Sequence, residues 1–295
     1  MPTELPTDQP LVSAFAGAQA NWAFVPSKSP WRVVFKRWWV RLSRKPGPAW
    51  KTLVPVKPSR RWMMYFIYLA DGKLTAGHRF TLQRLASEDA DLLVICACPE
   101  NHAVLEELKT LCDALYWKAE QGWDFSAYAL GLTELARLSP GADVLAMNDS
   151  LFGPFKPLVP FMDAAPWRLT GFTGNNGGEE IHLQSYAFVI KRIGQDVMTA
   201  LAPVMSTDWC YNTATSVIML QETQLARVAS AHFSVGAFWY GDDPKKTDLC
   251  LFYPKELIAA GFPFMKRSLL GKFATVFQDL GEMRELLGSM GHPVD

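Results

Sequence analysis

The sequence predicts an α/β fold built on a mixed, mostly parallel sheet flanked by helices. Apolar residues make up 49% of the 295 residues and charged residues 20%, a composition that folds around a core. From residue 60 onward, short β-rich apolar runs alternate with segments of helical periodicity. Strands spaced by helices pair in parallel and have helices on both faces of their sheet.

Three buried strands separated by helical stretches are expected in the first part of this region. The run WMMYFIYLA ends at a turn formed by Asp71 and Gly72, and the runs DLLVICA and DVLAM have the same apolar character. The expected strands are 62–70, 91–97 and 143–147, and the expected helical stretches are 80–85, 103–111 and 124–138.

The following part of the chain predicts an antiparallel hairpin. A short strand candidate, 169–173, is followed by the glycine and asparagine cluster 174–178 and then by the apolar run 181–192. Two strands joined by such a cluster pair as a hairpin with a long loop. The sheet is therefore expected to be mixed rather than wholly parallel.

The front end lacks the alternation of strand-like and helix-like segments, so we divide the chain into residues 1–59 and a main domain, 60–295. Residues 1–30 show little periodicity and are expected to form a loose leader. Residues 31–44 predict a helix, ended by Pro46. At 100° per residue, one side of this helix collects the apolar residues Trp31, Val34, Phe35, Trp38 and Leu42.

Charge separates the same two regions. Residues 1–60 carry ten Lys and Arg against two acidic residues, an excess of eight positive charges, whereas the remainder carries 19 basic and 27 acidic residues. A basic, tryptophan-rich helix is typical of an anchor on an anionic membrane surface. The alternative is a helix that packs on the protein's own body, with its basic side in water.

No apolar run approaches the roughly 20 residues needed to cross a bilayer, and no secretion signal is recognisable. We therefore expect a cytoplasmic protein, peripheral on the inner face of the cell membrane. The acidic body opposes nucleic-acid binding. Fingerprints of dinucleotide-binding, P-loop and α/β-hydrolase enzymes are absent from the sequence.

The segment MNDSLFGP, directly after the third strand, is the strongest candidate for a ligand-binding motif in the sequence. Ligands of open α/β sheets lie at the carboxyl ends of the strands, where Asn148, Asp149 and Ser150 would emerge. Asp149 is a candidate to hold a divalent cation, which neutralises the diphosphate of a nucleotide leaving group. The alternative is a plain turn, because Asn, Asp and Ser bond readily to their own backbone.

Two further groups of polar residues are candidates for binding. Asp124 follows Gly122, which lets the chain approach a ligand closely, and either accepts hydrogen bonds from a ribose or base edge or caps the following helix. His182 and Gln184, two residues apart on one strand, are candidates to bind sugar hydroxyls, although a lone histidine on a strand is commonly structural.

Four elements of the chain also resemble a known family in the same order. They are Gly122 to Tyr128, Asn148 to Pro154, the pair of segments TGFT and HLQSY, and Pro263 to Lys266. Over roughly residues 60–270, the chain is similar to the rhamnan synthesis protein F family, bacterial glycosyltransferases of surface polysaccharides. The resemblance implies a GT-A-like fold, a nucleotide-sugar donor and a glycan or lipid-linked acceptor.

The positions of these residues, taken together with the resemblance, give the roles that we expect. Asp124, Asn148 and Ser150 would bind the donor. Asp149 would bind Mg²⁺ or Mn²⁺, although the usual Asp-x-Asp pattern has only this one acid here.

An inverting transfer needs a base that accepts the proton of the acceptor hydroxyl. Glu222, which would open an amphipathic helix, is similar to the acidic helix start of many inverting GT-A enzymes, and Asp208 is the reserve candidate. The sugar would be a hexose such as rhamnose. The competing interpretation is a non-catalytic, membrane-associated scaffold of polysaccharide assembly.

Overall fold

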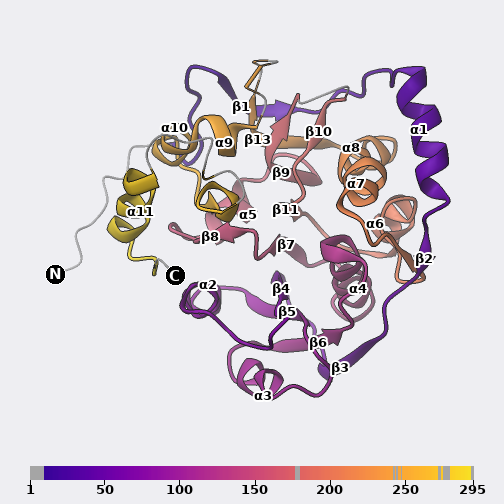
Figure 1. The fold of residues 1–295 in the computed structure, drawn as a ribbon, viewed down its shortest axis with the longest axis vertical. Coiled ribbons are helices and arrows are strands. Elements are labelled where there is room, and N and C mark those ends of the chain that lie inside the picture. The colour runs from indigo at the N-terminus through magenta and orange to yellow at the C-terminus, as the bar shows by residue number, and fades with distance from the viewer. Residues whose placement is uncertain are drawn as a thin grey trace.

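The computed structural model describes residues 10–176, 180–241, 248–271 and 280–293, together with Asp243, Lys245, Lys246 and Ala274. Figure 1 shows a central sheet with helices on both sides. Within the described ranges, every helix is too short or too polar to traverse a lipid bilayer.

One large sheet organises the molecule. Among the described residues it has ten strands: β1 (Ala18–Ala23), β3 (Trp50–Val54), β4 (Arg61–Tyr68), β5 (Asp91–Ala97), β6 (Ala114–Lys118), β7 (Asp143–Asn148), β9 (Leu169–Asn175), β10 (His182–Leu183), β11 (Ala187–Ile190) and β13 (Val235–Gly241). Their order is β1-β13-β9-β11-β7-β4-β5-β6-β3, and β10 pairs with the end of β9.

The pairings of the strands confirm a mixed sheet. Strands β4, β5, β6, β7, β9 and β13 run in one direction, and the other four described strands of the sheet run in the opposite direction. The predicted strands near 62–70, 91–97, 143–147 and 169–173 correspond to β4, β5, β7 and β9. The antiparallel hairpin is also confirmed, because β10 and β11 both pair with β9. Gly177 and Gly178 of the predicted turn lie outside the described residues.

Helices cover both faces of the sheet. One face packs against α4 (Trp123–Leu138), α6 (Gln195–Leu201) and α8 (Thr223–Ser230). The other packs against α2 (Ala76–Ala86), α3 (Val104–Lys109), α5 (Val159–Ala164), α9 (Leu249–Phe252) and α10 (Pro254–Ala259). The remaining described helical elements are α1 (Trp31–Arg41), α7 (Ala214–Val217), the π-helical turn η1 (Ile218–Glu222), the 3-10 turn η2 (Arg267–Leu269) and α11 (Leu280–Ser289).

The residues of β4 explain why both faces are covered. Met64 and Phe66 belong to one hydrophobic core, whereas Met63 and Tyr65 belong to the core on the opposite face. Successive side chains of a strand point to opposite faces, so a continuous apolar run gives two apolar faces. Such a strand is stable only between two layers of helices.

The front end is more than a loose leader. Strand β1 pairs antiparallel with β13, and Trp22 stacks on Tyr240 with 4.2 Å between the ring centroids. Strand β3 pairs antiparallel with β6. The sheet therefore draws strands from both sides of the boundary predicted between residues 59 and 60. Only residues 10–30 of the predicted leader are described, and the interpretation of those residues as a loose segment is wrong.

Among the described residues, two small sheets accompany the large one. Strand β2 (Lys45–Pro46) pairs with β12 (Trp209–Cys210), and β8 (Leu151–Phe152) pairs with β14 (Met265–Lys266). The second pair brings the C-terminal part of the chain to the segment that directly follows β7. It thereby places Lys266 beside the motif 147–154.

The strand order creates a switch point at β4. From β4 the chain moves outward through β5 to β6, and it then returns to place β7 on the other side of β4. After β4 the chain continues toward β5, and after β7 it continues to the opposite side of the sheet, toward β9 and β11. In open α/β sheets, ligands bind in the crevice at such a point.

Candidate active site

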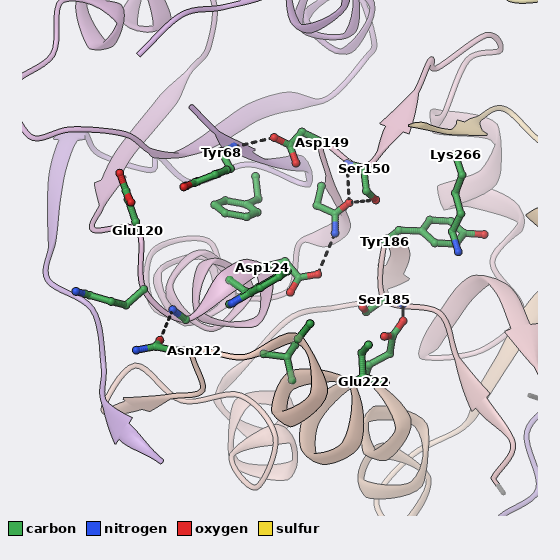
Figure 2. Close-up of a pocket in the computed structure, with 18 residues that line it drawn as sticks. Tyr68, Glu120, Asp124, Asp149, Ser150, Ser185, Tyr186, Asn212, Glu222 and Lys266 are labelled. Atoms are coloured by element: carbon green, nitrogen blue, oxygen red, sulfur yellow. Dashed lines mark hydrogen bonds between the residues drawn. The ribbon is translucent and has the colours of Figure 1, made fainter. Parts of the chain in front are cut away.

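A cavity of about 720 Å³ opens where the strands of the switch point end. This volume lies within the range of small-molecule sites, roughly 300–1,000 Å³. Figure 2 shows the site with Asp124 between Asp149 and Glu222 in this view. The cavity is lined by Phe66, Tyr68, Glu120, Gln121, Gly122, Trp123, Asp124, Asn148, Asp149, Ser150, Ser185, Tyr186, Asn212, Ala214, Val217, Ile218, Glu222 and Lys266.

Asp149 joins the two strands of the switch point. Its Oδ2 accepts a hydrogen bond of 2.8 Å from the backbone N–H of Tyr68, at the end of β4 (Figure 2). Burial raises the pKa of Asp149, while the Tyr68 N–H and the nearby Arg267 oppose the shift. The carboxylate is thus held at the expected end of β7, and it lines the cavity.

Asn148 serves both the turn and the site. Its Oδ1 accepts hydrogen bonds from the N–H of Ser150, at 3.1 Å, and from the hydroxyl of Ser150. Its Nδ2 donates to Oδ2 of Asp124 at 3.0 Å. The plain turn expected as the alternative for this segment is present, and the role of Asp149 as a cation ligand stays a prediction.

Asp124 is half-buried in the first turn of α4. The helix begins at Trp123 with Gly122 as its N-cap residue, and Asp124 Oδ1 accepts the N–H of Phe125 at 3.0 Å. The predicted N-cap role is therefore wrong in position, although the carboxylate still satisfies a free N–H of the first turn. Burial and then the charge of Glu222 raise the pKa of Asp124 to about 7.

Gly122 allows α4 to begin close to the cavity. Its φ of +84° lies in the left-handed region, which favours glycine. A Cβ at this position would lie 2.6 Å from the Cβ of Ser126 and 2.8 Å from the Cβ of Cys210. The Gly122 N–H donates to Oδ1 of Asn212 at 3.0 Å, which ties the loop after β6 to the loop after β12.

Glu222 reaches the cavity from a different local structure than predicted. It does not open a helix: it is the last residue of η1, with helical turns before and after it. The expected position of this carboxylate at the start of a helix is therefore wrong, and it faces none of the free N–H groups of a helix's first turn. Its Oε1 accepts the N–H of Ser185 at 3.1 Å (Figure 2). π-helical turns are rare, and many are found at functional sites.

Asp208, the reserve candidate for the base, is not brought to the cavity. It is exposed in the short loop before β12, where its backbone N–H bonds to Oγ of Ser206 and its carbonyl accepts the N–H of Gly47. None of the residues that line the cavity belongs to that loop. Asp208 therefore lies outside the cavity, although it is next to Trp209 in the sequence.

His182 and Gln184 are buried beside the cavity and are not among the residues that line it. Both ends of the Gln184 amide are used: Oε1 accepts from Thr173 at 2.6 Å, and Nε2 donates to Asp248 at 3.0 Å. Burial lowers the pKa of His182, and the charges of Glu222 and Asp248 oppose this shift. Their predicted role as acceptor ligands therefore requires a rearrangement, and it stays a prediction.

Lys266 is a site residue whose role the sequence pattern did not indicate. Its Nζ donates to Oδ2 of Asp248 at 2.8 Å and lies 5.4 Å from the centroid of the Tyr186 ring. Burial lowers its pKa, but the charges of Asp248, Cys250 and Glu222 outweigh burial and raise it. The closing element Pro263 to Lys266 was the available signal, without a role attached to it.

Two aromatic side chains at the cavity were also missed. Tyr68 is 45% exposed and Trp123 is 49% exposed, and both line the cavity. Aromatic rings half open to water are platforms on which planar or sugar rings stack. Nothing in their sequence context separates them from the many core aromatics of this chain.

The described part of the chain has no metal site made from protein side chains alone. Among the described residues, no three His, Cys, Asp or Glu side chains come together as a metal site. Asp149 alone nevertheless fits one kind of cation, because Mg²⁺ is commonly held by one or two carboxylates together with phosphate oxygens of a substrate.

The elements that carried the family resemblance meet at this site. Tyr128 donates to the carbonyl of Ser185 at 2.9 Å, and Ser185 in turn donates to Glu222. Asp124 contacts Asn148, while Gln184 and Lys266 share the carboxylate of Asp248. The four segments thus form one continuous hydrogen-bonded cluster.

The chain was also compared with known proteins. No protein-family model matches it. The virulence protein VirA of Vibrio anguillarum is 25% identical, and the match covers 72% of this chain and 80% of VirA. The resemblance to the rhamnan synthesis protein F family therefore stays a prediction.

Three solved structures are similar to this chain at low sequence identity. The 4-diphosphocytidyl-2C-methyl-D-erythritol synthase from Anaerococcus prevotii is 12% identical, covering 68% of this chain and 95% of its own, with a TM-score of 0.34. TarS 1–349 from S. aureus is 11% identical, covering 78% and 79%, with a TM-score of 0.35. A Desulfovibrio desulfuricans G20 protein assigned as a nucleotide-diphospho-sugar transferase is 13% identical, covering 79% and 99%, with a TM-score of 0.33. All three TM-scores are below 0.5, so we argue the function from the residues of the cavity.

Proposed function

We propose that this protein is a glycosyltransferase that takes a sugar from a nucleotide-sugar donor. One observation carries the proposal: polar side chains from distant segments of the chain converge on one cavity at the switch point of the sheet. Asp124, Asn148, Asp149, Ser150 and Glu222 all line it. Such crevices bind nucleotides in open α/β sheets.

The side chains divide between binding and chemistry. Tyr68 and Trp123 offer aromatic faces for the base or the sugar. Asp124 and Asn148, held together at 3.0 Å, offer acceptors and donors to a ribose or base edge. Ser150 is positioned by Asn148 and adds a hydroxyl beside them.

Glu222 is the proposed base. Its carboxylate accepts the proton of the acceptor hydroxyl while the hydroxyl oxygen attacks the anomeric carbon of the donor sugar. The bond from that carbon to the diphosphate breaks, and the nucleoside diphosphate leaves with the electron pair. Attack from the face opposite the leaving group inverts the anomeric centre. Ser185, which donates to Oε1 of Glu222, keeps the carboxylate oriented.

Asp149 is the residue that would hold Mg²⁺ or Mn²⁺ together with the donor's phosphates. A bound cation supplies charge neutralisation of the diphosphate leaving group. Lys266, at the same cavity, adds a positive charge of the protein's own.

The family resemblance supports the finer part of the proposal. It favours a hexosyl group such as rhamnose and, as acceptor, a glycan or lipid-linked precursor of a bacterial surface polysaccharide. The alternative function is a non-catalytic scaffold of polysaccharide assembly. The convergence of carboxylates in one cavity favours the enzyme, since a scaffold has no need to bury Asp124 there.

The proposal is tested first by donor binding and then by transfer. A panel of nucleotide sugars is screened for a rise in melting temperature, because a ligand that binds the folded state stabilises it. With the donor found, Glu222→Gln is expected to lower kcat by about 10²- to 10⁴-fold, the usual contribution of a positioned base. Donor affinity should stay unchanged.

Asp208→Asn is the matched control, because Asp208 is acidic and lies outside the cavity. We expect it to keep full activity. Full activity of Glu222→Gln beside an active wild type would show that Glu222 is not the base. A panel in which no nucleotide sugar stabilises the protein or is turned over would favour the scaffold.

A further inference from the structure

Helix α1 exposes a face of large apolar side chains. Figure 1 shows it at the outer edge of the molecule, next to the segment α7–α8. Phe35, Trp38 and Trp39 form a cluster with ring centroids 5.1 to 6.5 Å apart. The exposed set, at 53% to 81% of its surface, is Trp31, Val34, Phe35, Trp38, Trp39 and Leu42. A contiguous apolar patch of this kind marks an interaction site.

The opposite side of α1 docks on the protein through Val33, Val40 and the buried charge of Arg37. Arg37 is buried, its Nη1 donates to Glu180 at 3.0 Å, and its Nη2 forms an ion pair with the same carboxylate. Its Nε donates to the carbonyl of Met219 in η1 at 3.1 Å. A helix on a protein surface ordinarily turns its apolar side inward. Here the polar anchor turns the tryptophans toward solvent.

Positive charges surround the exposed face. Lys36, Arg41 and Lys45 are all exposed on or next to α1. The sequence has no acidic residue between Asp8 and Asp71, so no neighbouring residue along the chain offsets these charges. A partner that complements this surface is apolar and anionic at once. A bilayer containing anionic lipids has both properties.

We propose that α1 lies in the interface of an anionic bilayer, with its aromatic cluster among the acyl chains and its Lys and Arg side chains at the headgroups. The anchor joins this surface to the cavity, because Arg37 holds η1, which also carries Ile218 and Glu222. If the proposed function holds, the membrane brings a lipid-linked acceptor to the side of the cavity that carries the base.

Sedimentation with vesicles tests the docking without any sugar donor. Full-length protein is mixed with vesicles of phosphatidylcholine alone or with phosphatidylglycerol added. We expect binding to the anionic vesicles only. Lys36→Gln and Arg41→Gln should each weaken it about fivefold, since a basic residue near an anionic surface contributes on the order of 1 kcal/mol. Trp38→Ala with Trp39→Ala should weaken it about tenfold or more, because two interfacial rings are lost.

Matched controls are Phe252→Ala, an exposed aromatic on α9, and Lys57→Gln, an exposed lysine between β3 and β4. Neither should change vesicle binding. Absence of binding to anionic vesicles would overturn the proposal. The proposal would also be overturned if sedimentation velocity gave a dimer for the wild type and a monomer for the Trp38 and Trp39 variant while both bound vesicles equally, because the face would then pair with a second copy. Transfer to a soluble acceptor should be unchanged in these variants, so failed docking and failed sugar transfer are distinguishable.

Discussion

Asp124 has a pKa near neutral pH, which is unusual for a carboxyl group. Burial raises its pKa to about 7, against an ordinary value of 3.8. Between these two values, the folded protein keeps a proton that the unfolded chain has lost. The free energy of unfolding contributed by this group therefore falls as the pH rises from about 4 to about 7. A difference of this size corresponds to about 4 kcal/mol.

We expect Asp124→Asn to remove that pH dependence. The free energy of unfolding is measured by urea denaturation from pH 5 to pH 8. As the pH rises, that of the wild type should fall while that of Asp124→Asn stays level, because the amide needs no ionisation inside the protein. Asp89→Asn, at an exposed site, is the control and should follow the wild type at every pH. If the difference between Asp124→Asn and wild type is constant across this range, Asp124 does not titrate as described.

The residue scale also shows how one carboxylate can have two tasks. Asp149 stabilises the junction of β4 and β7 through the Tyr68 N–H, and it lines the cavity. Substitutions at this position therefore affect packing as well as binding. Glu222 is a cleaner target for mutagenesis, since glutamine keeps the oxygen that accepts from Ser185.

At the scale of elements, the attachment of α1 depends on a buried ion pair. Glu180 accepts from Arg37 and lies 3.7 Å from Arg227. Removing one partner of a buried pair leaves an uncompensated charge, at a cost of roughly 3–5 kcal/mol. Arg37→Met should therefore destabilise the docked helix.

Hydrogen exchange measures this effect element by element. The amides of α1 should lose protection in Arg37→Met while those of β4 and β5 keep theirs, because α1 contributes only Val40, at the margin, to the sheet cores, whereas β4 and β5 lie inside them. Arg41→Met, an exposed arginine on the same helix, is the control and should leave exchange unchanged. Equal protection of α1 in both variants would show that the ion pair does not hold the helix.

For the whole molecule, the front end is part of the folding unit. Strand β1 covers the edge of β13, and β3 covers the edge of β6. A chain that begins at residue 60 loses both strands and exposes two sheet edges, which are templates for aggregation. We expect it to aggregate or to melt well below the full-length protein.

A chain that begins at residue 25 tests the contribution of β1 alone. It lacks β1 but retains β3, so its melting temperature should lie between the other two. Thermal unfolding followed by circular dichroism gives the comparison. A chain beginning at residue 60 that melts with the full-length protein would restore the boundary at 59 and 60 as a true domain limit.

Local patterns predicted much of the sheet and part of the site. Apolar runs in β4, β5 and β7 are long and bounded by turn residues, so they are recognisable without the fold. The short strand β6 and the glycine-containing β13 were missed, since five residues or a run with two glycines carry little signal. The expected position of Asn148, Asp149 and Ser150 at the end of the third strand is confirmed, because Asn148 is the last residue of β7 and the other two follow it.

The sequence by itself determined which segments are apolar on both sides, where the strand after residue 142 ends to within one residue, and that a basic aromatic helix exists. Only the tertiary structure decided that β1 joins the sheet, that Glu222 lies within a helical stretch, and that α1 turns its tryptophans outward. The Arg37 and Glu180 pair behind that orientation spans 143 positions of the chain. Periodicity reports which residues avoid water over one or two turns, whereas contacts between distant segments depend on how the whole chain closes on itself.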